Sequence, residues 1–594
     1  MTLSTQHPIS STENETALKI RYHVAMPRPE NHLFEVILQL NGYQLPILDL
    51  KMPVWTPGSY LVREYAKNLQ DFQAIATSQA LPWRKVSKNH WQIDTAGVSK
   101  LTIKYRVFAN ELSVRTNHLD ATHGYFNGAP LFFRIVGFDK QVITISVTPP
   151  HPEWIVTSGL NKLEGHLNTF VADDFDTLVD SPFEVGTQEL YKFDVLGKSH
   201  ELAIWGKGNY QAEEMIADFK KIIEVEAGMF GGLPYDRYVF LLHLFSQAYG
   251  GLEHKNSCSL VYQRFGFRER DKYERFMQLV AHEFFHLWNV KRIRPKGLEI
   301  FDYEQENYTP SLWFCEGTTS YYDLLIPLRA GIYNAKKFLL NWSKEISRYL
   351  TTPGRRVQPL AESSFDAWIK LYRQDANSPN SQMSYYLKGE MVSLVLDLLI
   401  RARHQNERSL DDVMLKMWEQ FGQLEIGYTP QELEEVIESV ADTDLFEFFE
   451  RYLHTTEELP FNDYLEAFGL QLVADGIEEN YFGVRLATEN GREIVKFVEY
   501  DSPAQLAGID TGDELLAIDG IKLTSGGLGD RLQDYQPGDT LQVAVFHQDK
   551  LSIYPVTLEQ GKPTKYLIKA VDNPTPLQED KFLGWLGEPL VNVR

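Results

Sequence analysis

Two histidines and a glutamate in the segment LVAHEFFHLWNVKRIRP (Leu279–Pro295) have the types and spacing of a metal site. His282 and His286 are four residues apart, so a helix over Phe276–Val290 would turn both imidazoles to one face. Two neutral imidazoles presented in this way form half of a zinc site. Glu283 is offset around the helix, where it can act on a water at the metal without binding the ion. The competing interpretation is two core histidines beside an accidental glutamate.

A catalytic zinc site also needs a third protein ligand and an open position. Glu316 offers one, because it lies in the apolar, helix-like segment LWFCEGTTSYY, where a buried carboxylate needs a partner such as a divalent cation. Glu299, Glu304 and Glu306 fall between His286 and this segment and are also possible ligands by count.

The chemistry that these residues predict is hydrolysis by an activated water. Zinc lowers the pKa of a water bound to it, and Glu283 would act as general base and pass the proton to a leaving amine. The oxyanion that forms needs a further donor. Tyr385 and Tyr386, in SYYLKGE, are the candidates, and core packing with a tethered hydroxyl is the alternative for each.

The elements that would position these groups fall into three regions. The runs HLFEVILQL, LTIKYRVFAN, QVITISVTP and HELAIWG, separated by turn residues, predict a β-sandwich in the N-terminal part. VWTPGSYLVREYAKNL (Val54–Leu69) predicts a rigid loop. From about residue 210, apolar residues recur at helical spacing, as in EEMIADFKKIIEVEAGMF and YLKGEMVSLVLDLLIRARH, interrupted by the strand-like run YVFLLHLF. Strand-like runs return from about residue 465.

These changes predict a multidomain chain with an N-terminal all-β sandwich-like domain, a mainly α catalytic domain and a smaller C-terminal β-rich domain. A length of 594 residues agrees with three or four units. The expected boundaries are 1–14 for a flexible N-terminus, 15–190 for the β-rich domain, 191–460 for the catalytic domain, 465–560 for the C-terminal domain and 561–594 for a tail.

Composition argues against several classes of partner and site. Lysine plus arginine is 58 and aspartate plus glutamate is 81, and the net charge of −23 argues against nucleic acid or an anionic membrane. Cys258 and Cys315 lie far apart and outside any CxxC pair, which argues against a disulfide framework. The N-terminus lacks the pattern of a secretory signal, and no segment reaches the roughly 20 apolar residues that cross a bilayer. We therefore expect a cytoplasmic protein.

The segments WTPGSY, GGLEH and HEFFHLWN together resemble the glycyl aminopeptidase family, a group of zinc peptidases related to aminopeptidase N. In that family a β-rich N-terminal domain carries the first segment, the catalytic domain carries the other two, and a PDZ-like domain follows. The resemblance covers about residues 15–560. It implies a thermolysin-like catalytic domain and one zinc ion per chain.

The resemblance also implies roles for the candidate residues. The implied zinc ligands are His282, His286 and Glu316. Glu316 is preferred to the glutamates of the preceding gap because LWFCEG matches the family pattern, although the gap is longer than in aminopeptidase N relatives. Glu283 would be the general base. Tyr386, two residues before a Lys-Gly pair, would be the transition-state donor, with Tyr385 as the fallback.

The segment YGGLEH implies which residues bind the substrate, because it looks like the exopeptidase segment of aminopeptidase N relatives. By this likeness Glu253 binds the free α-amine, and Gly250 and Gly251 let the substrate backbone lie close. The alternative is a β-turn with an exposed glutamate. Glu184, in VDSPFEVG, is a candidate for a second amine-binding carboxylate, against the interpretation of a turn at a domain boundary.

SPAQLAGIDTGDELLAIDG (Ser502–Gly520) resembles the core of a bacterial-type PDZ domain, and YFGV resembles its carboxylate-binding loop. A PDZ domain adds an extended peptide to a sheet edge and caps the C-terminal carboxylate of that peptide with backbone amides. The implied peptide-binding residues are Tyr481, Phe482, Gly483 and Val484. A structural module without a ligand is the alternative.

The sequence therefore predicts a cytoplasmic zinc aminopeptidase acting on peptides with a free N-terminus. A preference for small N-terminal residues such as glycine or alanine comes from the resemblance alone. Two alternatives stay open. One is a zinc endopeptidase in which the PDZ domain selects chain termini, and the other is a PDZ-bearing scaffold with a catalytically silent metal site.

Overall fold

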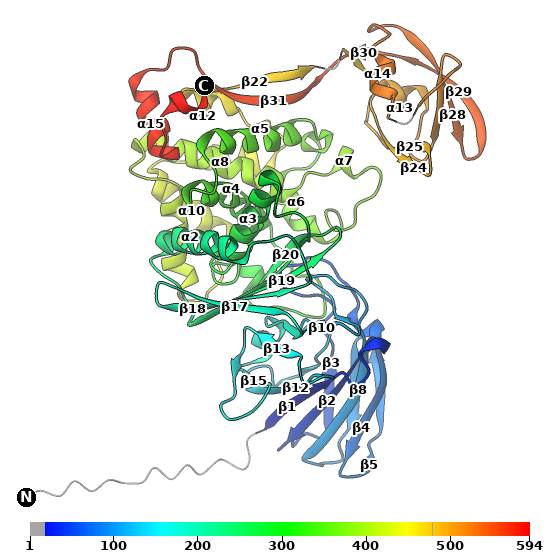
Figure 1. Cartoon of the computed structure of the whole chain (residues 1–594), viewed down its shortest axis with the longest axis vertical. Helices are drawn as coiled ribbons and strands as arrows, with labels where there is room; N and C mark the ends of the chain where they lie inside the picture. Colours follow the sequence, from blue (N-terminus) through cyan, green and yellow to red (C-terminus); the bar gives the residue numbers. More distant parts are fainter. Residues whose placement is uncertain (1–17, 478, 525) are drawn as a thin grey trace, which may run out of the picture.

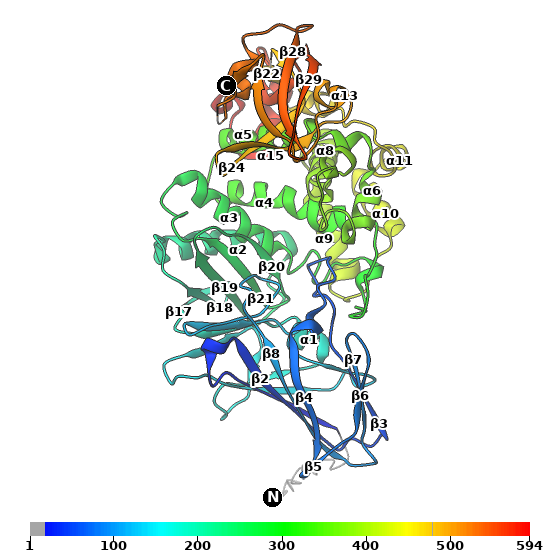
Figure 2. The same cartoon turned by 90° about the vertical axis from the view of Figure 1, so that its right-hand side faces the viewer.

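The computed structural model describes residues 18–477, 479–524 and 526–594. The predicted flexible N-terminus, residues 1–14, lies outside the described residues. Figure 1 and Figure 2 show three parts arranged along the long axis, with an N-terminal β-rich domain at one end and a helical domain in the middle. A small β-rich domain lies at the other end, displaced to one side in Figure 1.

The N-terminal domain is built from one large and two small sheets. The large sheet has the order β14 (Asn161–Lys162), β15 (Thr169–Ala172), β12 (Ile143–Thr148), β1 (Lys19–Ala25), β2 (Leu33–Asn41), β8 (Lys100–Phe108), β4 (Leu69–Ala76) and β5 (Gln79–Ala80). One small sheet has the order β13 (Ile155–Ser158), β16 (Phe183–Gly186), β10 (His123–Phe126) and β9 (His118–Leu119). The other has the order β11 (Arg134–Ile135), β3 (Ile47–Lys51), β7 (His90–Asp94) and β6 (Trp83–Ser87). Alternate residues of β2 and β8 are buried, as expected for strands with one face on a core. The β-rich N-terminal domain that the sequence predicts is confirmed.

The middle, mainly helical domain contains a five-stranded sheet that the sequence only partly revealed. Its order is β17 (Glu189–Val195), β18 (Lys198–Trp205), β19 (Arg237–Phe245), β21 (Ser257–Gln263) and β20 (Tyr249–Glu253). HELAIWG, which we grouped with the N-terminal strands, lies in β18 and pairs in parallel with β19. That grouping is wrong because strand pattern alone does not identify the partner strand. The edge strand β20 pairs antiparallel with β21.

Helices cover one face of this sheet and form the rest of the domain (Figure 2). They are α2 (Ala212–Phe230), α3 (Arg270–Phe285), α4 (Thr318–Arg329), α5 (Ala335–Leu350), α6 (Leu360–Phe365), α7 (Ser378–Ser381), α8 (Tyr385–His404), α9 (Leu410–Met417), α10 (Pro430–Ala441), α11 (Phe446–His454) and α12 (Phe461–Leu465). α8 is buried along nearly its whole length, so it forms the centre of the helical core. Within the described ranges, no helix is long and apolar enough to cross a membrane.

The small β-rich domain is inserted between two paired strands. β22 (Leu470–Ile477) leaves the helical domain and β31 (Pro563–Ala570) returns antiparallel beside it, as Figure 1 shows. Between them lies a sheet of β24 (Val484–Glu489), β25 (Arg492–Val498), β26 (Glu514–Ile518), β28 (Thr540–His547) and β29 (Lys550–Thr557), with β27 (Ile521–Lys522) beside β26. The helices α13 (Pro503–Ala507) and α14 (Leu528–Leu532) and the pair β23 (Asn480–Tyr481) and β30 (Glu559–Gln560) complete it.

The segment 561–594, expected as a tail, is instead part of the fold. After β31, α15 (Pro576–Leu586) packs on the helical domain, where Phe582 and Trp585 are buried and the Trp585 ring lies 5.7 Å from that of Phe338. Short connections and mixed composition hid this return in the sequence. The small domain also contacts the helical domain through Asn380, whose amide donates to Val498 O at 2.9 Å.

Candidate metal centre

The helix α3 carries the histidine pair at its C-terminal end. We expected a helix through Val290, but α3 ends at Phe285 and His286 is its C-cap residue. His286 keeps right-handed helical angles, with φ −60° and ψ −19°, so it still lies one turn after His282 on the same face. The ring centroids of the two histidines are 4.7 Å apart. The early end of the helix therefore leaves the pair intact.

Glu316 joins this pair from a π-helical turn, Trp313–Gly317, that precedes α4. Its Oε2 lies 3.1 Å from His286 Nε2 and 3.6 Å from His282 Nε2. One ligand atom from each of the three residues lies within 4.8 Å of the others. π-Helical turns occur often at functional sites, because the wider turn changes where one side chain points.

The other glutamates of the gap lie outside this group. Glu299 forms an ion pair with Lys296, and Glu304 pairs with Lys51 at 2.8 Å. Among the described residues, Glu306 does not belong to any group of His, Cys, Asp and Glu side chains close enough to share a metal ion. The structure thus brings Glu316 to the histidines and places Glu299 and Glu304 in ion pairs elsewhere.

Each histidine is oriented by a contact on its other ring nitrogen. His282 Nδ1 lies 2.9 Å from Asp323 Oδ2 on α4, and His286 Nδ1 lies 2.6 Å from Asn289 O. Proton donation from Nδ1 to these oxygens leaves the Nε2 lone pairs directed at Glu316, as metal-binding histidines require. Asn289 in turn donates to Phe314 O at 2.9 Å, which ties the end of α3 to the π-helical turn. Two imidazole nitrogens and one carboxylate oxygen fit a catalytic zinc ion.

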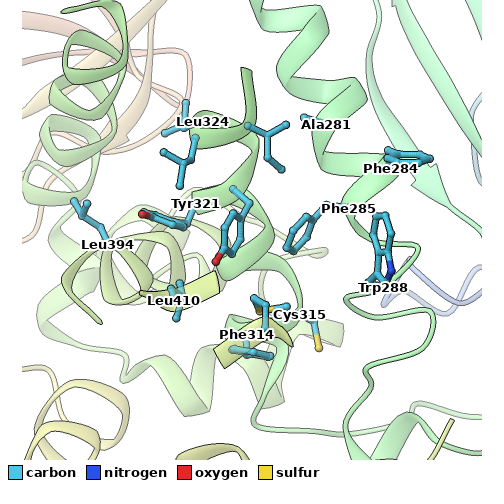
Figure 3. Close-up of a cluster of buried hydrophobic side chains, with 14 of the residues drawn as sticks. Ala281, Phe284, Phe285, Trp288, Phe314, Cys315, Tyr321, Leu324, Leu394 and Leu410 are labelled. Carbon is cyan, nitrogen blue, oxygen red and sulfur yellow. The ribbon is translucent and has the colours of Figure 1, made fainter. Parts of the chain in front are cut away.

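The opposite face of α3 anchors the pair in the hydrophobic core. Figure 3 shows the side chains that do this: Ala281, Phe284, Phe285 and Trp288 of α3 and the segment after it, with Phe314, Cys315, Tyr321, Leu324, Leu394 and Leu410 from the surrounding elements. The Phe285 ring stacks on Tyr322 at 4.6 Å. Close packing on this side restricts rotation of α3, so the histidines keep their direction.

Glu283 lies between the group formed by His282, His286 and Glu316 and the edge strand β20. It is 5% exposed, and its Oε2 has no hydrogen-bond partner within the described residues. Burial raises the pKa of its carboxyl group, and the nearby His282 and His286 lower it in part. A Cβ atom at Gly251 would lie only 2.2 Å from Glu283 Cδ, so β20 passes directly against this carboxylate.

Glu253 ends β20 and is 3% exposed, so the alternative of an exposed glutamate in a turn is wrong. A carboxylate oxygen of Glu253, one of Glu283 and a ring nitrogen of His286 lie within 4.8 Å of one another. The WTPGSY loop closes this side, because a Cβ atom at Gly58 would lie 2.5 Å from Glu253 Oε1. Gly250 has φ +147°, a conformation that favours glycine.

The two tyrosines begin α8 but differ in their surroundings. The Tyr386 ring lies 6.4 Å from the His282 ring, and its hydroxyl lies 3.3 Å from the hydroxyl of Tyr372. Burial raises the pKa of Tyr386, and the Glu316 carboxylate raises it further, so the hydroxyl keeps its proton. Tyr385 is fully buried behind it, with the two rings stacked at 4.7 Å.

Several residues at the site were missed by the sequence reasoning. Arg115, from the N-terminal domain, donates from Nη2 to Gly251 O at 3.3 Å and lies within electrostatic range of Glu283 and Glu253. Asp323 and Tyr372 were also missed. Arg115 and Tyr372 lie in irregular segments with no local motif, so no sequence signal identified them.

Glu184, a candidate for amine binding, lies elsewhere. It is 1% exposed in β16, between His123 and His243, so both the amine-binding role and the boundary turn are wrong. An acidic residue near Pro and Gly in the sequence gives no information on which residues surround it after folding.

The predicted carboxylate-binding loop precedes the edge strand β24. Gly483 has φ +88°, and a Cβ atom there would lie 2.1 Å from Ser502 Cβ. A groove of about 360 Å³ between this loop and α14 is lined by Phe482, Gly483, Val484, Leu528 and Leu532 among others. Tyr481 is outside that lining, and its ring lies 3.6 Å from Lys562 Nζ, measured from the ring centroid.

Comparisons with known proteins agree with this architecture. Family models match as the peptidase M61 N-terminal domain over residues 21–187, M61 glycyl aminopeptidase over 275–392 and a PDZ domain over 480–558. A solved aminopeptidase N family protein from Idiomarina loihiensis is 31% identical with a TM-score of 0.90, over 96% of this chain and 100% of that one. An M1 zinc metallopeptidase from Deinococcus radiodurans is 13% identical with a TM-score of 0.47, over 75% of this chain and 95% of that one. The comparison with curated proteins gave no match.

The three-part fold and the site together define a zinc aminopeptidase that carries a PDZ domain. The chain belongs to the M61 glycyl aminopeptidase family.

Proposed function

We propose that this aminopeptidase removes small N-terminal residues, such as glycine and alanine, from peptides with a free N-terminus. The observation that carries the proposal is that the group His282, His286 and Glu316 meets the carboxylates of Glu253 and Glu283 in one buried site. A carboxylate beside a metal can bind the ammonium group of a chain end, and internal peptide segments have no such group. This arrangement therefore favours exopeptidase activity.

In this proposal each side chain has one task. His282, His286 and Glu316 hold one catalytic zinc ion, which when bound lowers the pKa of water and polarises a carbonyl group. Glu283 accepts the proton of the attacking water and passes it to the leaving amine. Its unpartnered, buried Oε2 supports that task, because no other group in the described residues competes for it.

Two further groups position the substrate and its transition state. The Tyr386 hydroxyl donates a hydrogen bond to the developing oxyanion, which its place beside His282 supports. Glu253 binds the α-ammonium, while Arg115 holds the backbone of β20 through the Gly251 carbonyl. Gly250 and Gly251 keep side chains away from the substrate backbone in this proposal.

The preference for small residues rests on the family, and the space on the WTPGSY side of Glu253 is narrow. A cavity of about 10 Å³ lies there, lined by Trp55, Gly58, Tyr60 and Val290 among others. That volume admits roughly one water-sized or methyl-sized group.

The PDZ domain has a free edge for a ligand. β24 ends the sheet, and the groove beside it is lined by apolar side chains from β24 and α14. We propose that it binds a peptide or protein C-terminus by adding a strand to β24. The net charge of −23 favours such a partner over nucleic acid or an anionic membrane.

A cytoplasmic location is part of the proposal. Cys258 and Cys315 are buried free thiols, and neither forms a disulfide in the part of the chain that the structure describes. Buried thiols of this kind are compatible with a reducing compartment.

The decisive experiment compares glycyl- and alanyl-p-nitroanilide with their N-acetylated forms, with and without a zinc chelator. Chelator-sensitive cleavage of the free-amine forms alone supports the aminopeptidase. Cleavage of the blocked forms instead supports the endopeptidase. A chain that binds zinc fully and turns over no peptide would be the catalytically silent scaffold. Leucyl- and arginyl-p-nitroanilide test the preference for small residues, and equal rates on them would contradict it.

A further inference from the structure

A hairpin of the N-terminal domain, away from the catalytic site, brings together three side chains of metal-ligand type. β9 and β10 pair antiparallel, so the sequence HLDATH returns His123 towards His118. One ligand atom each from His118, Asp120 and His123 lies within 4.8 Å of the others. We propose that these three residues bind a second divalent metal ion of the zinc type, in addition to the catalytic one.

The distances in this hairpin repeat those of the catalytic group. His118 Nε2 lies 3.1 Å from Asp120 Oδ2, and His286 Nε2 lies 3.1 Å from Glu316 Oε2. Two ligands that are each about 2.0 Å from one tetrahedral ion lie about 3.3 Å apart. The side chains are therefore already as close as two ligands of the same ion.

Contacts behind the hairpin also repeat the pattern of a metal site. His123 Nδ1 lies 2.9 Å from Glu184 Oε1, and His243 Nε2 lies 2.8 Å from Glu184 Oε2. All three side chains are at most 2% exposed. A carboxylate that receives the Nδ1 proton leaves the Nε2 lone pair of His123 available to a metal ion, as Asp323 does for His282.

A buried ring nitrogen of His123 needs a partner that the protein does not supply. Within the described residues, His123 Nε2 and His118 Nδ1 have no hydrogen-bond partner. The His123 ring cannot turn away, because it is stacked on Trp205 at 3.6 Å with an angle of 12° between the planes. A bound ion would have His123 Nε2, His118 Nε2 and Asp120 Oδ2 as ligands, and of the two unpartnered nitrogens it would satisfy His123 Nε2.

An ion-pair network without metal accounts for only part of this arrangement. It explains the two contacts of Glu184 with His123 and His243 and the contact of His118 with Asp120, but within the described residues it leaves His123 Nε2 without a partner. The turn uses Asp120 Oδ1, which accepts from Thr122 N at 2.7 Å, and this leaves Oδ2 for the ion. With its side chain 33% exposed, Asp120 opens the site to solvent, so an ion can enter.

The position of the hairpin assigns the ion a structural role. Glu184 belongs to the N-terminal domain and His243 to β19 of the catalytic domain, so the contacts cross the domain boundary. Arg115 lies three residues before His118 and reaches the Gly251 carbonyl at the catalytic site. An ion at the hairpin would fix the segment that holds Arg115 against β20.

The test is the zinc content of the full-length protein after loading with zinc and removal of unbound ion, measured by elemental mass spectrometry. We expect roughly two zinc ions per wild-type chain and roughly one in His118→Gln and Asp120→Asn. The matched control is His166→Gln, at an exposed histidine outside the hairpin, which should keep the wild-type content. Unchanged zinc content in both hairpin variants would overturn the proposal.

A second measurement separates this site from the catalytic one. In the Glu316→Ala background, added zinc should raise the melting temperature, because an ion that binds only the folded chain stabilises it. The same addition should leave the melting temperature of Glu316→Ala/Asp120→Asn unchanged. An equal rise in both proteins would place the ion elsewhere and refute the hairpin site, whatever peptides the enzyme cleaves.

Discussion

Replacement of Gly251 by alanine should disable Glu283, the proposed base, without touching the proposed metal ligands. The new Cβ atom would lie 2.2 Å from Glu283 Cδ, whereas ordinary contacts begin near 3.4 Å, so the carboxylate must move by about 1.2 Å. Strand β20 cannot retreat instead, because β21 pairs with it on one side and Arg115 binds the Gly251 carbonyl. A misplacement of about 1 Å costs roughly 100-fold in rate, or about 2.7 kcal/mol.

The assay is kcat and KM on glycyl-p-nitroanilide, with zinc content and melting temperature measured on the same samples. We expect kcat to fall roughly 100-fold in Gly251→Ala, with zinc content unchanged. Gly228→Ala is the matched control, because a Cβ atom at that helical position meets nothing within 4 Å. It should keep full activity.

A double variant tests whether the loss acts through Glu283. If Gly251→Ala works by displacing the base, it should add little to the loss that Glu283→Gln already causes. An undiminished 100-fold further loss in Gly251→Ala/Glu283→Gln, or wild-type activity in Gly251→Ala alone, would refute the reasoning.

Four further outcomes test the proposed roles. Glu283→Gln should retain zinc and lose roughly 100- to 10,000-fold in kcat, and normal turnover would remove it as the base. Glu316→Ala should weaken zinc retention, measured by dialysis against a chelator, and a normal zinc content would eliminate it as a ligand. Glu253→Ala should raise KM chiefly for substrates with a free amine, and an unchanged KM would contradict ammonium binding. Lys388→Met should stabilise the fold at pH 7. Burial lowers the pKa of Lys388 to about 8, so below that pH the folded chain holds a buried charge that the unfolded chain hydrates. The gain in unfolding free energy should be up to about 3 kcal/mol at pH 7 and should vanish as the pH rises from about 8 to above 10.5, as chemical denaturation at each pH would show. A gain that is the same at every pH would show that the charge is not its cause.

Local spacing was enough to predict the parts of the site that lie on one element. His282, Glu283 and His286 follow from the helical repeat, even though α3 ends five residues earlier than expected. Glu316 could be predicted from the sequence because a carboxylate in an apolar segment is unusual by itself.

What the sequence did not reveal depends on contacts between distant segments. Arg115 reaches the site from another domain, 136 residues before the Gly251 carbonyl that it binds. Glu184 seemed a candidate for the site, yet it binds His123 and His243 at the domain boundary. No periodicity encodes such pairings, because they depend on how separate elements pack after each has formed.

Because the chain enters and leaves the PDZ domain through the paired strands β22 and β31, the domain can be deleted as a unit. Ile477 and Pro563 are paired across the two strands, so the points where the chain enters and leaves the domain are neighbours. A short turn joining them would close β22 and β31 into a hairpin and delete the domain while keeping α15 in the core. A stop codon at the same place would also remove α15, and with it the Trp585 contact to Phe338. Excision by an internal deletion is therefore compatible with this architecture, whereas truncation from the C-terminus damages the enzyme itself.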